Sequence, residues 1–89
     1  MMNISLVIPL FNEEESLSEL CTQIDNVMRQ NNFTYEVILI DDGSKDKSWE
    51  VIEQITTSNQ NIKGIKFRRN YGKSAALNVG FSKVKGKVV

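Results

Sequence analysis

Four short apolar runs, rich in β-branched residues, alternate with longer segments of helical periodicity. The runs are Ile4–Leu10, Tyr35–Ile40, Ile62–Phe67 and the terminal Val88–Val89. Strands that alternate with helices are typical of βαβ units around a largely parallel sheet. This order predicts an α/β fold with the sequence β-α-β-α-β-α-β, and the last run is interpreted as a fourth strand cut off at its start.

The same order suggests one structural unit. No linker, repeat or low-complexity segment interrupts it, and 89 residues fit one small domain or part of a larger one. A folded chain of this size buries only roughly 60–65% of the surface that its unfolded form exposes. We therefore expect residues 1–89 to be a single domain that is incomplete.

The first helical segment carries a single apolar stripe. Its members repeat at intervals of three and four residues and are Leu17, Leu20, Cys21, Ile24, Val27 and Met28. The stripe predicts a helix that buries this face. Cys21 is the only cysteine, so we expect a core thiol and no disulfide within the chain.

Two further helices are predicted from apolar spacing. In the second segment, Trp49, Ile52 and Ile55 lie three residues apart, which predicts a helix over 47–57 with this stripe against the sheet. Ser44 or Asp46 can cap its start through a side-chain oxygen. In the third segment, small residues predict a helix over 74–84 that lies close to the sheet and is closed by a glycine; they are Ala75, Ala76, Gly80 and the closing Gly86.

Charge and hydropathy limit the possible partners. Eleven basic residues balance eleven acidic ones, so the chain lacks the positive field that attracts nucleic acid. The apolar run Leu6–Phe11 is far shorter than the ~20 residues of a membrane-spanning helix, and no basic segment precedes it. We expect a cytoplasmic chain that binds no nucleic acid and contacts a membrane only through parts outside these residues.

Ligands of open α/β sheets bind beyond the carboxyl ends of the strands, which directs attention to three loops. In the first loop, Glu13, Glu14 and Glu15 precede a helix, where acids complement the positive end of the helix dipole. In the second, Asp41 and Asp42 follow a strand directly. A tight turn needs one of these carboxylates, and the other is then free to accept hydrogen bonds from a nucleobase or ribose. Turn capping alone and metal binding are the alternatives.

The third loop is basic. Arg68, Arg69 and Lys73 lie at the same edge of the sheet, and guanidinium groups match phosphate oxygens. Gly72 permits close approach of the chain to a ligand or a positive φ. A solvated basic loop is the alternative, but beside the acidic loop it predicts a cleft for a nucleoside and its diphosphate.

The three loops together resemble the first motifs of glycosyltransferase family 2. The matching segments run from Pro9 to Glu13, from Asp41 to Ser44 with Asp46 and Ser48 following, and from Arg69 to Leu77. The last segment is similar to the polyprenyl-phosphate branch, which is related to dolichol-phosphate mannosyltransferase. The resemblance implies a Rossmann-like GT-A fold. It also implies nucleotide-binding roles for eight residues: Pro9, Phe11, Glu13, Ile40, Asp41, Asp42, Arg69 and Lys73.

The resemblance further implies an inverting transfer of a sugar from a UDP- or GDP-sugar to a polyprenyl phosphate at the cytoplasmic face of a membrane. The family's metal-binding Asp-x-Asp, which holds Mg²⁺ or Mn²⁺, and its general base are expected beyond Val89. We therefore expect no catalytic or metal-binding residue within residues 1–89, and no activity from them alone. A saccharide acceptor in capsule or lipopolysaccharide synthesis and a non-catalytic nucleotide-binding module are the alternatives. A Rossmann dehydrogenase is disfavoured, because no Gly-x-Gly-x-x-Gly follows the first strand.

Overall fold

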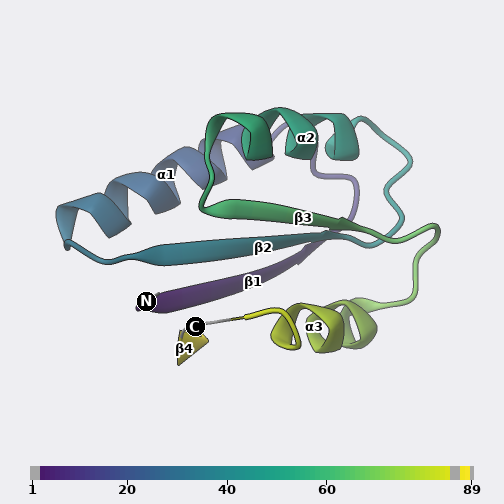
Figure 1. Ribbon diagram of the computed structural model, residues 1–89. Coiled ribbons are helices and arrows are strands. Elements are labelled where there is room, and N and C mark those ends of the chain that lie inside the picture. Colours follow the sequence, from purple (N-terminus) through teal and green to yellow (C-terminus); the bar gives the residue numbers. More distant parts are fainter. Residues whose placement is uncertain (1–2, 85–86, 89) are drawn as a thin grey trace.

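A parallel sheet organises the chain (Figure 1). The computed structural model describes residues 3–84 and 87–88. Along the chain the elements are β1 (Ile4–Leu10), α1 (Leu17–Gln30), β2 (Tyr35–Asp41), α2 (Ser48–Ser58), β3 (Ile62–Lys66), α3 (Lys73–Phe81) and β4 (Lys87–Val88). The strands are ordered β3-β2-β1-β4, and every described pairing is parallel. The α/β order expected from the sequence is confirmed.

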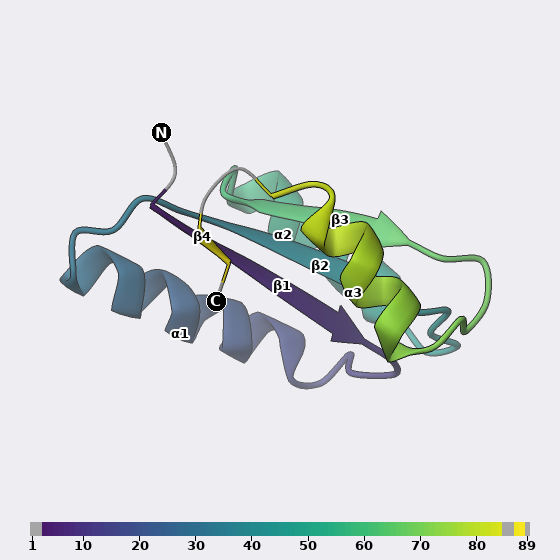
Figure 2. The same cartoon turned by 90° about the horizontal axis from the view of Figure 1, so that it is seen from below.

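Helices cover both faces of the sheet (Figures 1 and 2). Helices α1 and α2 lie on one face and α3 lies on the other. The central strand β2 is buried along its whole length, as expected for a strand between two helical layers. Because side chains alternate along a strand, Val37 and Leu39 pack with α1 and α2, whereas Ile38 and Ile40 pack with α3.

Helix α1 buries the predicted stripe with one exception. Leu17, Cys21 and Met28 are buried, and burial raises the pKa of the Cys21 thiol, as expected for a core cysteine. Val27, however, is 53% exposed. It lies ten residues after Leu17, which is short of a whole number of turns at about 3.6 residues per turn, so it falls at the margin of the stripe.

Helix α2 begins at Ser48, and its N-cap position is Lys47, which makes no side-chain capping bond. Of the two residues expected to cap the start, Asp46 binds the first helical N–H from one position before the N-cap. The Asp46 Oδ1 accepts hydrogen bonds from the Ser48 N–H at 2.8 Å and from the Ser48 hydroxyl at 2.6 Å. The predicted stripe faces the sheet: Ile52 is fully buried, while Trp49 and Ile55 are half-buried against the same core.

Helix α3 confirms the close approach that its small residues predict. A Cβ added at Gly80 would lie 2.2 Å from the Val7 Cγ1 and 2.6 Å from the Ile40 Cδ1. The helix ends at Phe81, earlier than the predicted residue 84. Beyond this point the Lys83 N–H bonds to the Gly80 carbonyl, three residues back, at 3.0 Å, so the α-helical bonding pattern does not continue. We expected Gly86 to close this helix and Val89 to belong to the fourth strand, and both residues lie outside the described residues.

Candidate functional site

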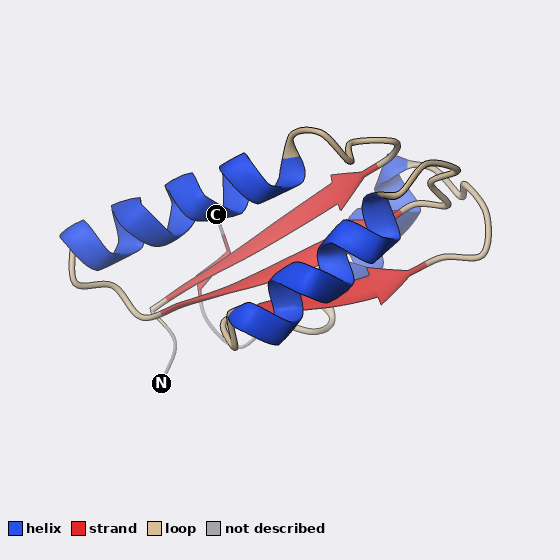
Figure 3. Ribbon diagram, turned by 90° about the horizontal axis from the view of Figure 1, so that it is seen from above, coloured by secondary structure: helices blue, strands red, loops and turns tan. Residues whose placement is uncertain are grey.

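The loops that follow β1, β2 and β3 gather at one end of the sheet, at the right of Figure 3. The strand register brings them together, because Leu10 pairs with Asp41 and Asp41 pairs with Lys66. A cleft of about 300 Å³ opens at this end. Its described lining comes from the ends of β1 and β2 and the start of α3: Pro9, Leu10, Phe11, Asp42, Asn70, Gly72 and Lys73. Four of the residues predicted for the site, Pro9, Phe11, Asp42 and Lys73, therefore share one cleft.

Asp42 joins the second loop to the third. Its side chain is only 5% exposed, and its two carboxylate oxygens accept hydrogen bonds from the Tyr71 N–H at 2.8 Å and the Gly72 N–H at 3.1 Å. Each carboxylate oxygen can accept a further hydrogen bond. Asp42 thus shapes the wall of the cleft and keeps acceptor capacity for a ligand.

Asp41 closes the turn that follows β2. Its Oδ1 accepts the Ser44 N–H at 2.7 Å, and the residue is 1% exposed. Its Oδ2 is buried and has no partner among the residues that the structure describes. The sequence left open which carboxylate serves the turn, and the geometry assigns Asp41 to the turn and Asp42 to the cleft.

Gly43 lets the second and third loops pack directly on each other. It has a φ of 80°, and a Cβ at this position would lie 2.3 Å from the Arg69 carbonyl carbon. Gly72 has a φ of 97°, so the positive φ that the sequence suggested for it is present. A Cβ at Gly72 would meet nothing within 4 Å. The two glycines are therefore needed for different reasons.

Arg69 does not belong to the described lining of the cleft. Its side chain is exposed, and its guanidinium carbon lies 5.1 Å from the centroid of the Tyr71 ring. The Tyr71 ring in turn meets the Phe67 ring edge to face, with centroids 5.5 Å apart. The basic side chain that lines the cleft is that of Lys73.

Ile40 and Glu13 also lie away from the cleft lining. The Ile40 side chain is fully buried against Ala76 of α3. The Glu13 Oε2 accepts the Ser16 hydroxyl at 2.9 Å, and Glu13 lines a neighbouring hollow of about 280 Å³ at the start of α1. The alternation along β2 could have shown this for Ile40, because residues 38 and 40 share the face that α3 covers.

Hydrogen bonds between the first and second loops were not expected from the sequence. We call these four bonds the loop clamp: Asn12 N–H to Ser44 Oγ at 2.8 Å, Lys45 N–H to Asn12 Oδ1 at 2.8 Å, Glu13 N–H to Ser48 Oγ at 2.9 Å and Glu14 N–H to Asp46 Oδ2 at 3.3 Å. The acceptors are short polar side chains in or beside the two loops. Such side chains often accept backbone N–H groups, so their presence in the sequence could have suggested these bonds. Which backbone N–H each one accepts depends on how the two loops pack.

Asp46 has a lowered pKa within this clamp. Burial opposes its charge, but the hydrogen bonds donated by the Ser48 hydroxyl, the Ser48 N–H and the Glu14 N–H outweigh that effect and lower the pKa of the carboxyl group. The charged form of Asp46 is therefore the form that these loops favour.

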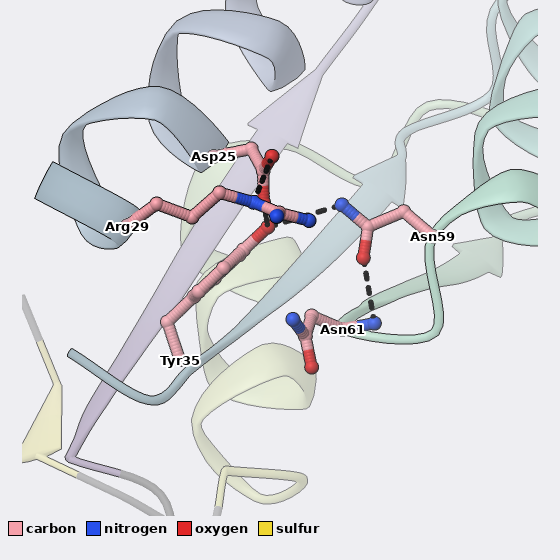
Figure 4. Close-up of polar contacts among 5 residues, drawn as sticks. All are labelled: Asp25, Arg29, Tyr35, Asn59 and Asn61. Atoms are coloured by element: carbon pink, nitrogen blue, oxygen red, sulfur yellow. Dashed lines mark hydrogen bonds and ion pairs between the residues drawn. The ribbon is translucent and has the colours of Figure 1, made fainter. Parts of the chain in front are cut away.

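A second groove lies at the other end of the sheet. It has about 490 Å³ and runs between α1 and the end of α2. Figure 4 shows the polar network beside it, in which the Tyr35 hydroxyl donates to the Asp25 Oδ1 at 2.7 Å and accepts from the Asn59 Nδ2 at 3.0 Å. Arg29 donates from its Nε to the Asp25 Oδ2 at 2.7 Å, and the Asn61 N–H donates to the Asn59 Oδ1 at 2.9 Å.

The described residues carry neither a metal-binding cluster nor a membrane-spanning helix. Residues 3–84 and 87–88 contain no group of three or more histidine, cysteine, aspartate or glutamate side chains placed to hold a metal ion. No helix in the same residues has both the length and the apolar character required to cross a bilayer.

Comparison with known protein families decides the classification. The model of Glycosyl transferase family 2 matches residues 5–89. The chain belongs to this family. The match includes all three loops at the carboxyl end of the sheet, and it confirms the resemblance drawn from their motifs.

Named relatives are similar over nearly the whole chain. An undecaprenyl-phosphate 4-deoxy-4-formamido-L-arabinose transferase from Pseudomonas fluorescens (strain SBW25) is 40% identical over 87 residues, which are 97% of this chain and 26% of the relative. The transferase of the same name from Photorhabdus laumondii is 42% identical over 87 residues, 97% of this chain and 27% of the relative. The chain thus spans about a quarter of the length of these curated relatives.

Solved structures show the same fold. The mannosyltransferase PcManGT from Pyrobaculum calidifontis, in complex with GDP-Man and Mn²⁺, superposes with a TM-score of 0.78 at 20% identity, covering 98% of this chain and 26% of that one. TarS 1-349 from S. aureus, in complex with UDP-GlcNAc, has a TM-score of 0.78 at 26% identity, covering 99% of this chain and 25% of that one. The fold is the Rossmann-like GT-A fold of glycosyltransferases.

Proposed function

We propose that residues 1–89 form the nucleotide-binding portion of an inverting glycosyltransferase that transfers a sugar from a UDP- or GDP-sugar to a polyprenyl phosphate. One observation carries the proposal: the 40% identity over 87 residues to a transferase named for undecaprenyl phosphate, a region that contains the whole cleft. The position of the cleft supports it, because ligands of open α/β sheets bind at the carboxyl ends of the strands.

Pro9 and Phe11 supply an apolar wall on which a nucleobase can lie. Phe11 is 40% exposed and lines the cleft, so its ring is available for stacking. The Asp42 carboxylate, which lines the same cleft, can accept an N–H of the base or a ribose hydroxyl with the acceptor capacity that Tyr71 and Gly72 leave. This division gives the base a flat apolar contact and a directional polar one.

Lys73 and the start of α3 are suited to the diphosphate. Lys73 lines the cleft and is the first residue of α3, whose start places free backbone N–H groups beside it. Arg69 can reach the phosphates only by leaving the face of the Tyr71 ring. We therefore assign the primary phosphate contact to Lys73 and a secondary one to Arg69.

The reaction we propose is a direct displacement at the anomeric carbon of the sugar. A phosphate acceptor is already ionised near neutral pH, so it needs less help from a general base than a sugar hydroxyl does. The related PcManGT structure contains Mn²⁺, and a divalent ion of this kind, Mg²⁺ or Mn²⁺, would stabilise the departing diphosphate. The described residues offer no such metal site, so we propose that the ion is held beyond Val89.

A lipid-linked acceptor places the proposed reaction at the cytoplasmic face of a membrane. The test is a transfer assay with the full-length protein, radiolabelled UDP- and GDP-sugars, and undecaprenyl phosphate in detergent. We expect label to pass into the organic phase only when the lipid phosphate is present. Transfer to a soluble saccharide instead would assign the acceptor to capsule or lipopolysaccharide synthesis. Nucleotide binding without transfer to either acceptor would indicate that the protein is a non-catalytic nucleotide-binding module.

A further inference from the structure

We infer that Asn12 is a positioning residue that sets the spacing of the nucleotide cleft without lining it. The inference rests on the proposed function of the cleft. Asn12 pairs with the second loop in both directions, since its N–H donates to the Ser44 Oγ and its Oδ1 accepts the Lys45 N–H, each at 2.8 Å.

The backbone of Asn12 makes this double contact possible. Its φ of 55° lies in the left-handed region, which asparagine tolerates better than most residues. This conformation turns the chain sharply after Phe11 and presents both the N–H and the side-chain oxygen to the second loop.

The residues beside the clamp are those that form the cleft. Phe11 immediately precedes Asn12, Asp42 lies two residues before Ser44, and both residues line the cleft. The strand ends are joined beneath them by the hydrogen bond from the Asp42 N–H to the Leu10 carbonyl at 2.9 Å. The clamp therefore fixes the distance between Phe11 and Asp42 from outside the cleft.

The clamp bonds are placed to affect geometry more than stability. Both bonds of Asn12 are exposed to solvent, where water can replace a lost partner. A ligand that must fit between Phe11 and Asp42, however, requires a defined spacing of the two walls. Loss of the clamp should therefore appear in ligand affinity and in local exchange before it appears in folding.

The chain provides closely matched variants. Asn12→Gly keeps the left-handed backbone, which glycine adopts freely, and removes Oδ1. Asn12→Asp retains an acceptor for the Lys45 N–H and serves as the rescue variant. Asn32 has a φ of 59° in the turn after α1, so Asn32→Gly controls for replacing a left-handed asparagine elsewhere.

The experiment measures amide hydrogen exchange and calorimetric binding of UDP and GDP in the full-length protein. We expect Asn12→Gly to accelerate exchange at Lys45 and Asp42 and to weaken nucleotide binding about threefold to tenfold, the value of a typical hydrogen bond. Asn12→Asp should restore most of the affinity, and Asn32→Gly should change neither readout. In steady state, the donor KM should rise more than kcat falls.

Two outcomes would overturn the inference. The first is unchanged exchange at Lys45 and Asp42 in Asn12→Gly, which would show that the clamp does not hold the loops. The second is faster exchange with unchanged nucleotide affinity, which would show that the clamp does not set the cleft. Failure of the unaltered protein to bind UDP or GDP would instead defeat the proposed function, and the exchange arm would still decide whether Asn12 positions the two loops.

Discussion

The two ends of the sheet use carboxylates in opposite ways. At the amino end, Asp25 accepts hydrogen bonds from two side chains, those of Arg29 and Tyr35, and a different one of its carboxylate oxygens bonds to each. At the carboxyl end, Asp42 accepts two backbone N–H groups of a loop and faces a cleft. The amino-end groove is the larger of the two, at about 490 Å³ against about 300 Å³. We place the proposed nucleotide site in the smaller cleft, because its side chains hold loops in place at the carboxyl ends of the strands.

The largest expected effect comes from filling the contact between the second and third loops. Gly43→Ala combines left-handed strain of about 1–2 kcal/mol with an overlap against backbone of about 1–3 kcal/mol. We expect the free energy of unfolding to fall by about 2–5 kcal/mol in chemical denaturation, with loss of nucleotide binding.

Gly72→Ala is the matched control for this substitution. Its φ of 97° and ψ of 157° lie in a region that is almost exclusive to glycine, at a cost of about 1–3 kcal/mol, but its Cβ would meet open space. If the two variants were equally destabilised, the close packing of the two loops would be wrong.

The next effect distinguishes the two carboxylates directly. Asp42→Asn places an amide NH₂ against one of the N–H donors of Tyr71 and Gly72, and removes the charge offered to the ligand. Hydrogen bonds to charged groups are worth about 1.5–3 kcal/mol, which corresponds to a loss of donor affinity of about 10-fold to 100-fold. Isothermal titration calorimetry with UDP and GDP measures it.

Asp25→Asn makes the same chemical change at the amino end. It should lower the free energy of unfolding while leaving donor affinity within about twofold of the unaltered protein, since its partners lie far from the cleft. Equal loss of donor affinity in both variants would remove the distinction between the two ends.

A smaller effect is expected from the phenol at the centre of the amino-end network. Tyr35→Phe removes one donated and one accepted hydrogen bond and should cost about 1–2 kcal/mol of stability with no change in donor KM. Burial, and then the neighbouring Asp25, raise the pKa of the Tyr35 hydroxyl above its usual 10.0. Because the folded pKa is the higher one, this contribution to stability is complete below pH 10.0 and is lost as the pH rises through the folded pKa.

The pH dependence gives Tyr35 a separate test. Spectrophotometric titration should show a tyrosine transition above pH 10.0 that is absent from Tyr35→Phe. A Tyr35 hydroxyl that titrated at or below pH 10.0 would contradict its burial.

The sequence predicted the fold well because its signals are local. The strands and helices were found from alternation and spacing along short segments, and β1 was placed with the bounds observed, Ile4–Leu10. The helix end that was predicted wrongly, that of α3, lies where two backbone hydrogen-bonding patterns are both possible. At the end of α3 the Lys83 N–H bonds to the Gly80 carbonyl three residues back instead of continuing the α-helical pattern, and the spacing of apolar residues does not distinguish these two choices.

The site was predicted less completely because its geometry is not local. The motifs placed Pro9, Phe11, Asp42 and Lys73 at one edge, and the strand register brings them into one cleft. The role predicted for Arg69 beside the phosphates stays a prediction, and in the structure its guanidinium lies over the Tyr71 ring of the same loop. The bond between Asn12 and Lys45, by contrast, joins two separate loops, and no spacing along the chain reports it.

The smallest expected effect concerns Asp46, which belongs to the clamp but not to the cleft. Its folded pKa is lowered from 3.8, so its charged form stabilises the loops above that pH, and the contribution is lost as the pH falls below it. The protection of the Glu14 and Ser48 amides, corrected for the intrinsic pH dependence of exchange, should therefore fall on acidification below about pH 4. In Asp46→Asn the protection of the same two amides should not change over this pH range. Because Asp46 is only partly buried and, among the described residues, bonds only to the first and second loops and the start of α2, we expect a local loosening of these loops and no global unfolding. An Asp46 carboxyl that titrated at or above 3.8 by NMR would show that the clamp does not favour its charge.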